Sequence, residues 1–185
     1  MKLEDDKIVI MCKDPDQMEL GIRHLIVQYK EKLYWQIKRI VEHHDDTEEV
    51  LQNVWIKIWQ NIGGFKGESA LSTWIYRITY NESISYIQGR KKQKLVDWET
   101  SERIVESQSE DKMFSHEIYD KEAVLKKIEL AVEKLPHKQK LIFHYRYNEE
   151  MPYNQIADIT GTSEGALKAS FHHAVKKIEE FIKKN

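Results

Sequence analysis

The segment that most constrains this chain is a helix-turn-helix pattern at residues 153–168, which reads YNQIADITGTSEGALK. Ala157 stands four residues before Gly161, and Leu167 stands six residues after it. Gly161 can take the left-handed conformation of a tight turn at little steric cost, and Ser163 can cap the helix that follows. We expect two helices joined by a sharp turn, the second placed like the helix that enters the major groove in DNA-binding proteins. For this segment alone, an ordinary helical hairpin is the alternative.

Composition favours helices elsewhere too. Charged residues make up 32% of the 185 residues, whereas the chain has only 7 Gly and 3 Pro, and this disfavours sandwiches and barrels. We expect an all-α fold of two small helical domains, at residues 1–95 and 121–185, joined by an acidic linker at 96–120. The one cysteine, Cys12, excludes an internal disulfide and is expected to fill an apolar core position.

Charge is distributed unevenly along the chain. The whole chain has a net charge of −2, but residues 63–94 carry +4, residues 97–122 carry −6 and residues 136–185 carry +2. Phosphate contacts dominate non-specific DNA affinity, so a free-standing DNA binder is usually more basic. No stretch approaches the roughly 20 apolar residues of a membrane span, and the N-terminus lacks a secretory signal. We expect a cytoplasmic protein without membrane insertion.

Apolar periodicity places the remaining helices. We expect one to begin at a cap on Asp16, and a second to follow the start signal Asp45-Asp46-Thr47 and end at Gly63-Gly64. A third opens at Ser69 or Ser72 and fades at Gly89. Helical spacing resumes at Val124, and Pro136 begins a further helix.

A second candidate nucleic-acid surface lies at residues 65–94, where aromatic rings alternate with cations. Bases of single-stranded nucleic acid stack on such rings while cations follow the backbone. Trp74 could be either a core residue or a base contact. The helix at 48–62 also has a mixed polar face, typical of contact with a partner protein.

Residues 46–59 (DTEEVLQNVWIKIW), 65–69 (FKGES) and 73–78 (TWIYRI) resemble the second conserved region of bacterial sigma factors, and residues 135–168 resemble the fourth. The best match is the extracytoplasmic-function (ECF) group of the sigma-70 family. The resemblance covers residues 18–94 and 121–182, with the linker between them, and is therefore more specific than any single motif.

The resemblance implies a sigma factor that binds core RNA polymerase and directs promoter recognition, DNA melting and transcription initiation. Docking on the beta-prime clamp is expected at Glu49, Gln52, Asn53, Ile56, Trp59 and Gln60. The −10 element would be read and melted by Lys66, Ser72, Trp74, Arg77, Tyr80, Asn81, Arg90, Lys91 and Lys92. The −35 element would be read by Tyr153, Ser163, Glu164, Gly165, Ala166, Lys168, Ala169, Ser170, His172 and His173.

The resemblance also implies partners: the beta-prime and beta subunits of the polymerase, promoter DNA and an anti-sigma factor, with the acidic linker threading toward the RNA exit path. No enzyme activity or cofactor is expected, because the sequence has no glycine-rich phosphate loop and no nucleophile elbow. No metal site is expected at His43-His44 or His172-His173, because adjacent residues rarely share a helix face. Ser170 and His173 stand at or near positions where the family often has arginine, and Glu82 could repel phosphates. A stand-alone helix-turn-helix regulator is the alternative function.

Overall fold

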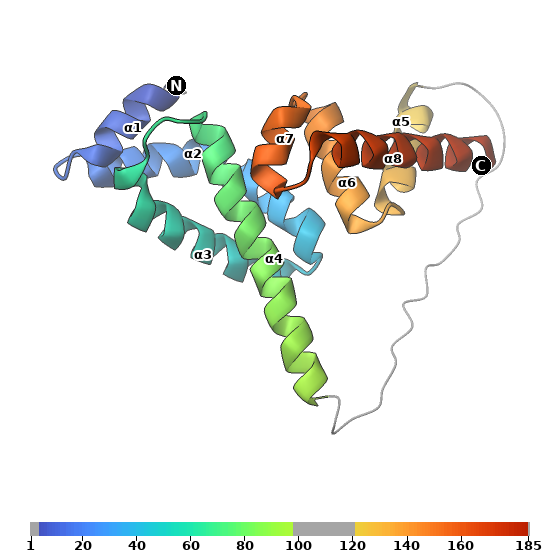
Figure 1. Ribbon diagram of the computed structural model, residues 1–185, viewed down its shortest axis with the longest axis horizontal. Coiled ribbons are helices and arrows are strands. Elements are labelled where there is room, and N and C mark those ends of the chain that lie inside the picture. Colours follow the sequence, from blue (N-terminus) through green and yellow to red (C-terminus); the bar gives the residue numbers. More distant parts are fainter. Residues whose placement is uncertain (1–3, 98–120, 185) are drawn as a thin grey trace.

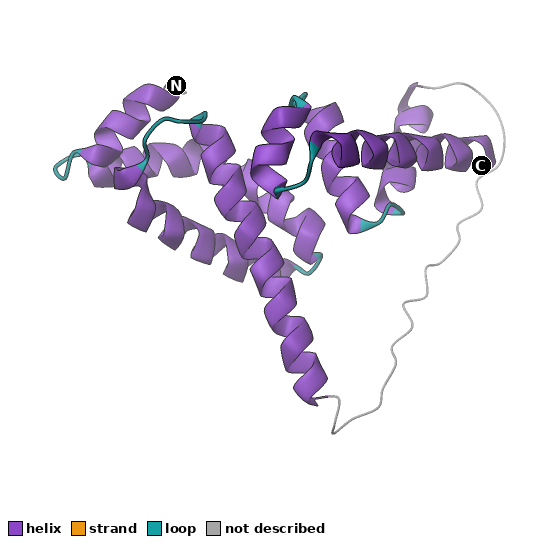
Figure 2. Cartoon of the chain, in the orientation of Figure 1, coloured by secondary structure: helices purple, strands orange, loops and turns teal. Residues whose placement is uncertain are grey.

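The computed structural model describes residues 4–97 and 121–184, and within these ranges every regular element is a helix (Figures 1 and 2). This confirms the predicted all-α class. The elements are α1 Asp5–Lys13, α2 Met18–Val41, α3 His44–Asn61, η1 Ile62–Gly64, α4 Leu71–Asp97, α5 Lys121–Glu133, α6 His137–Phe143, η2 His144–Asn148, α7 Tyr153–Thr160 and α8 Glu164–Lys184. η1 is a 3-10 turn and η2 a π-helical turn.

The N-terminal half is a bundle of α1 to α4 around one apolar core. Leu33 and Ile37 of α2, Ile58 of α3 and Ile75 of α4 are fully buried. In α3 the buried positions Val50, Leu51, Val54 and Ile58 recur at helical spacing, so one face packs inward and the other stays in water. Helix α3 begins at His44 without a side-chain cap, slightly before the predicted start, and Asp45 and Asp46 lie in its first turn, where the helix dipole favours carboxylates.

The first helix, α1, is an element that the sequence analysis missed. Ile8 and Cys12 are 0% and 2% exposed, so Cys12 is the apolar filler that we expected. The Asp5 carboxylate accepts hydrogen bonds from Tyr29 Oη at 2.8 Å and Gln28 Nε2 at 2.7 Å, both from α2. With nine residues and two buried side chains, α1 shows little periodicity of its own, and its attachment to α2 holds it in place.

Two predicted helix ends are wrong. No side chain caps α2, which begins at Met18; Asp14 instead accepts the backbone N–H of Asp16 at 3.0 Å in the preceding turn. Helix α4 does not fade at Gly89 but continues to Asp97. Its extension beyond the bundle is tied to α3, because Arg90 forms an ion pair with Asp46. The rest of the predicted acidic linker, 98–120, lies outside the described residues.

The C-terminal half contains α5 to α8 and confirms the helix-turn-helix. Gly161 has a φ of 65° and ψ of 18°, the left-handed conformation expected at the turn. Ser163 Oγ accepts the Ala166 backbone N–H at 3.4 Å, a long capping contact. Leu167 and Ile156 are 0% exposed, so the two helices share a packed core as the pattern predicted.

The two halves pack against each other, with α7 lying beside α4 (Figure 1). Gln155 Nε2 of α7 donates to Thr73 Oγ1 of α4 at 2.7 Å, and the rings of Tyr76 and Tyr145 stack with centroids 6.3 Å apart. Lys32 of α2 lies 3.6 Å from Glu149. We call this contact the inter-module interface. Its apolar residues form one continuous cluster with the N-terminal core.

A buried histidine makes the folded state sensitive to acid. Burial, and then the charge of Arg39, lower the pKa of His144 from 6.5 to about 4, although the Glu149 carboxylate lies 3.5 Å away. The folded state thus favours the neutral imidazole. This stability is fully present above the unfolded pKa of about 6.5 and is lost as pH falls toward 4.

We therefore expect the free energy of unfolding to drop by about 2 kcal/mol more between pH 7 and pH 5 in the wild type than in His144→Asn. Urea denaturation at the two pH values measures this difference. His43→Asn, at an exposed histidine, is the control and should keep the wild-type pH dependence. Parallel pH profiles for wild type and His144→Asn would show that His144 does not carry the effect.

Candidate nucleic-acid interface

All six residues predicted to bind polymerase lie on one exposed face of α3. Their spacing along the helix keeps them within about a third of its circumference, opposite the buried stripe. Ile56 and Trp59, three residues apart on this face, are 53% and 47% exposed and together form an apolar patch. The set is Glu49, Gln52, Asn53, Ile56, Trp59 and Gln60, each classed as exposed. Such a patch of apolar and amide groups is suited to protein contact rather than to phosphate.

The acidic Glu82, which could have repelled DNA, faces α3 instead. Its side chain is only 16% exposed and forms an ion pair with Lys57 of α3. Its charge is therefore compensated within the bundle. Sequence spacing could not reveal this pairing, because the two residues are 25 positions apart.

The predicted −10 residues do not form one surface. Trp74, Arg77 and Asn81 follow one another at helical spacing on one face of α4. Tyr80, half-buried, lies toward the inter-module interface, where its charged form would raise the pKa of Tyr145. Arg90 lies on the α3 side and pairs with Asp46.

The remaining −10 residues are also dispersed. Lys66 is exposed on the loop before α4, and Ser72 is half-buried in its first turn. The side chains of Lys91 and Lys92 lie outside the described residues. Tyr86, one of the aromatic rings of the candidate surface at residues 65–94, donates to Asp46 at 2.8 Å and to Glu49 at 3.1 Å, and burial with these hydrogen bonds raises its pKa to about 12.

Trp74 is half-buried, so part of its side chain packs against the core and part is open to solvent. Its ring lies 5.4 Å from that of Phe65, which is 8% exposed and belongs to the core. A ring fixed on one side by packing and partly open on the other can offer a face to an unstacked base. Trp74 thus lies between Phe65 in the loop before α4 and the exposed surface of α4.

Nine of the ten predicted −35 residues form a surface on the first turns of α8 and the turn before it, whereas Tyr153 begins α7. Ser170 and Tyr153 are half-buried; the others are exposed, namely Ser163, Glu164, Gly165, Ala166, Lys168, Ala169, His172 and His173. Small residues at the start of α8 leave its backbone open to close approach. The start of a helix carries backbone N–H groups without helical partners, and these groups favour the binding of a phosphate.

Two cations share the Tyr153 ring beside this surface. Lys168 Nζ lies 5.6 Å from the ring centroid, and the guanidinium carbon of Arg146 lies 5.2 Å from it. Arg146 also donates to the Met151 carbonyl at 3.2 Å. The sequence analysis missed Arg146 because it lies in η2, outside any regular pattern. It adds one cation where the helix itself has Ser170 in place of the family's frequent arginine.

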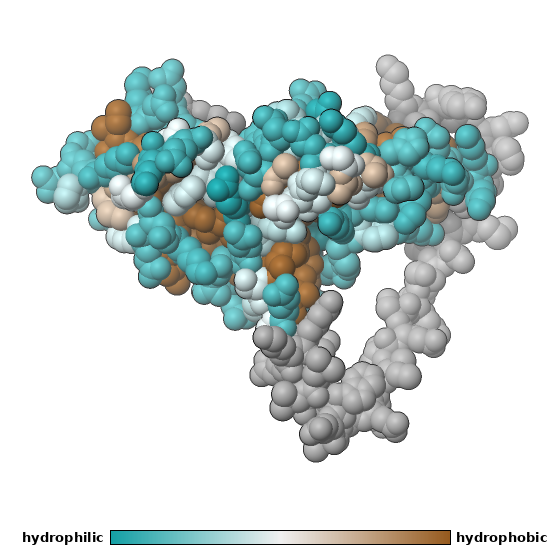
Figure 3. Space-filling view, in the orientation of Figure 1, coloured by the Kyte–Doolittle hydropathy of each residue, from teal (hydrophilic) through white to brown (hydrophobic). Residues whose placement is uncertain are grey.

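The visible face of the molecule is mainly hydrophilic with separate hydrophobic patches (Figure 3). Within the described ranges, no helix is long and apolar enough to cross a membrane, and no group of three or more His, Cys, Asp or Glu side chains could hold a metal ion.

Two regions of the chain match known family models. Residues 25–93 match sigma-70 region 2, and residues 125–178 match sigma-70 region 4. The chain is 26% identical over 191 residues to the ECF RNA polymerase sigma-E factor of Escherichia coli (strain K12), covering 98% of this chain and 95% of that protein. It is 23% identical over 151 residues to RNA polymerase sigma factor SigV of Bacillus subtilis (strain 168), covering 82% and 84%.

Two solved structures share the fold. The sigma factor RpoE of Bartonella quintana, in complex with the anti-sigma factor NepR, superposes with a TM-score of 0.63 at 21% identity, covering 87% of this chain and 96% of that one. CnrH, in complex with the cytosolic domain of CnrY, gives a TM-score of 0.64 at 14% identity and covers 98% of both chains. With both conserved regions matched in order and spanning most of its length, this chain belongs to the ECF group of the sigma-70 family.

Proposed function

We propose that this chain binds core RNA polymerase and directs it to promoters, where it recognises the −35 and −10 elements, helps to melt DNA and starts transcription. The polymerase catalyses RNA synthesis and makes most of the contacts that hold the DNA duplex. That division of roles accounts for a net charge of −2 in a protein with two candidate DNA-binding surfaces.

The observation that carries the proposal is the exposed face of α3. A stand-alone helix-turn-helix regulator does not require Ile56 and Trp59 to be exposed to solvent and surrounded by amide side chains. A subunit that docks on a larger enzyme needs such a patch, because apolar and aromatic anchors supply most of the affinity at protein interfaces. The beta-prime clamp is the proposed partner of this face, and the beta subunit a further one.

The inter-module interface adds a geometric requirement. The −35 and −10 elements are about 25 base pairs apart, which at 3.4 Å per base pair is roughly 85 Å. In this structure α7 contacts α4 directly, with Gln155 and Thr73 joined by a 2.7 Å hydrogen bond. One chain cannot occupy both elements in this arrangement. We propose that the modules separate when polymerase binds.

An anti-sigma factor is the proposed inhibitor. One of the solved structures above is the sigma factor RpoE bound to the anti-sigma factor NepR. Core polymerase acts in the cytoplasm, and we propose the same location for this chain.

Reconstitution with core polymerase tests the function. Purified chain and core enzyme are mixed with fragmented genomic DNA, and the start sites of the transcripts are sequenced. We expect a set of start sites that share upstream elements and that need the chain. The proposal fails if the chain neither binds core enzyme nor changes where transcription starts.

Lys168→Ala tests the −35 surface. Lys168 is exposed beside the start of α8, and its ion pair with Glu164, 3.4 Å away, lies on the helix surface, where a phosphate can replace the carboxylate. We expect transcription to fall about three- to tenfold at promoters with an intact −35 element, and the salt slope of duplex binding to fall by about 0.9. Lys183→Ala, near the end of α8, is the control. Equal activity of Lys168→Ala on intact and scrambled −35 elements would contradict the assignment.

A further inference from the structure

We propose that acid opens the inter-module interface, because protonation of His144 cancels the charge attraction that Glu149 provides between the two modules. The N-terminal module is α1 to α4 and the C-terminal module is α5 to α8. Both His144 and Glu149 belong to the C-terminal module, and both face α2 of the other one. The inference concerns the interface itself, and only its consequence for transcription rests on the proposed function.

With His144 neutral, the charges across the interface are complementary. Glu149 Oε2 lies 3.6 Å from Lys32 Nζ of α2, and Glu149 Oε1 lies 3.5 Å from His144 Nε2. Arg39 is also on α2, and Glu149 is the carboxylate that attracts it most strongly among the described residues. Two cations of the N-terminal module therefore face the Glu149 anion. A proton on His144 neutralises the C-terminal side of this contact, so the attraction is lost.

The contact is buried enough for these charges to act strongly. The side chains of His144 and Glu149 are only 14% and 23% exposed. Arg39 Nη1 is buried and has no hydrogen-bond partner within the described part of the chain. Burial, followed by the charge of Arg39, lowers the pKa of His144 to about 4, so the closed arrangement disfavours the imidazolium. Separation of the modules removes Arg39 and hydrates the ring, which returns its pKa toward 6.5.

The other groups near His144 do not supply a compensating charge. Glu133 of α5 attracts Arg39 less strongly than Glu149 does, and it already forms an ion pair with Lys140 at 2.9 Å. The remaining titratable neighbours are phenols, which are neutral in acid, and burial raises the pKa of each: Tyr76, Tyr80 and Tyr145. Protonated His144 thus keeps only the carboxylate that Lys32 and Arg39 already use.

One histidine at the interface acts in the opposite direction. His137 Nδ1 of α6 lies 3.3 Å from Glu42, which follows α2, and protonation of His137 would strengthen this pair between the modules. The two side chains are 58% and 54% exposed, however, and exposed ion pairs contribute little. The buried His144 therefore determines the sign of the response to acid.

The difference in pKa sets the size of the response. With a pKa of about 4 in the closed form and about 6.5 in the open form, the ratio of open to closed chain rises about tenfold between pH 7.5 and pH 5.5. The contribution of His144 to closure is complete above pH 6.5 and is lost as pH falls toward 4. Since we propose that polymerase binds the open form, its apparent affinity should rise by the same factor where the closed form predominates.

The test measures how fast a thiol at the interface reacts with a pyridyl disulfide. In Thr73→Cys the thiol replaces a side chain that is 3% exposed and hydrogen-bonded to Gln155 of α7, so labelling requires the modules to separate. The rate is measured at pH 7.5 and pH 5.5 with His144 and with His144→Asn. The intrinsic reactivity of the thiol changes equally in the two chains. We expect the ratio of their rates to rise about tenfold on acidification.

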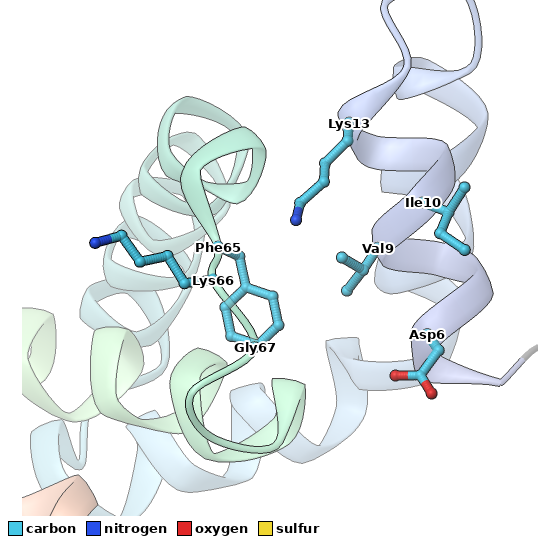
Figure 4. Close-up of a pocket in the computed structure, with 7 residues that line it drawn as sticks. All are labelled: Asp6, Val9, Ile10, Lys13, Phe65, Lys66 and Gly67. Atoms are coloured by element: carbon cyan, nitrogen blue, oxygen red, sulfur yellow. The ribbon is translucent and has the colours of Figure 1, made fainter.

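Cys12 distinguishes separation of the modules from unfolding. It is 2% exposed, and the chain without the Thr73 substitution reports its labelling alone. Figure 4 shows Val9 and Lys13 of α1 facing the loop at Phe65, so the helix that carries Cys12 is enclosed within the N-terminal module and stays covered when the interface opens. Labelling of Cys12 should therefore stay slow at both pH values.

Two further variants complete the design. Arg39→Gln removes the charge that, after burial, lowers the pKa of His144, so it should reduce the response to acid. His43→Asn, at an exposed histidine, should retain the full response. Circular dichroism checks that each variant is folded.

An equal pH dependence of the rate with His144 and with His144→Asn would overturn the proposal, and an undiminished response in Arg39→Gln would have the same meaning. Parallel acceleration at Cys12 would also overturn it, because acid would then unfold the chain rather than separate its modules. Failure of the wild-type chain to bind core polymerase would instead count against the proposed function, and leaves the thiol measurement valid.

Discussion

Replacing Trp59 by aspartate is expected to weaken binding to core RNA polymerase by about 30-fold or more. The side chain is 47% exposed and lies beside Ile56, which is 53% exposed, so the two form the apolar centre of the docking face. Truncating a central aromatic anchor at a protein interface costs at least about 2 kcal/mol, which corresponds to that factor. Pull-down or fluorescence titration with purified core enzyme measures the change.

Exposure also makes Trp59 a clean probe, because its replacement opens no cavity in the core. Trp35→Asp is the matched control: this tryptophan is 49% exposed but lies on α2, away from the docking face. Both variants should melt within a few degrees of the wild type. Gln52→Glu should give a smaller loss in the same direction. Wild-type polymerase affinity in a folded Trp59→Asp protein would refute the docking assignment.

Locking the inter-module interface is expected to reduce promoter-dependent transcription at least tenfold. Lys32 and Glu149, whose charged groups lie 3.6 Å apart across the interface and are accessible to solvent, can be replaced by cysteines and linked with a short, reducible bismaleimide. The linked modules cannot span the roughly 85 Å between promoter elements. The natural Cys12 should not compete, because it is 2% exposed and burial raises its pKa.

Two controls distinguish the effect of locking the inter-module interface from damage caused by the substitutions or the crosslinker. Reducing the crosslinker should restore transcription, and the double variant before crosslinking should be active. Linking cysteines at Lys57 and Glu82, which lie within the N-terminal bundle, should leave promoter-dependent activity near that of the unlinked chain. Full activity of the locked protein would show that the modules do not need to separate.

The sequence alone determined the helical class and the local signals. Apolar spacing in α3 predicted its buried stripe, whereas the docking role of the exposed Trp59 was implied by the resemblance to sigma factors. Gly161, Ala157 and Leu167 predicted the helix-turn-helix, whose glycine adopts the left-handed conformation that the turn requires. These features depend on residues within a few turns of one another, so their spacing along the chain is sufficient information.

Only the tertiary structure decided which distant side chains meet. It pairs Glu82 with Lys57, holds Arg90 on Asp46, and places α1 against α2 so that Lys13 faces the loop at Phe65. It also buries Tyr76 and Tyr145 in one interface. These contacts join residues far apart in the chain, and their energies come from desolvation and charge pairing between separate helices. No local pattern encodes them, because each partner alone has the sequence of an ordinary helix surface.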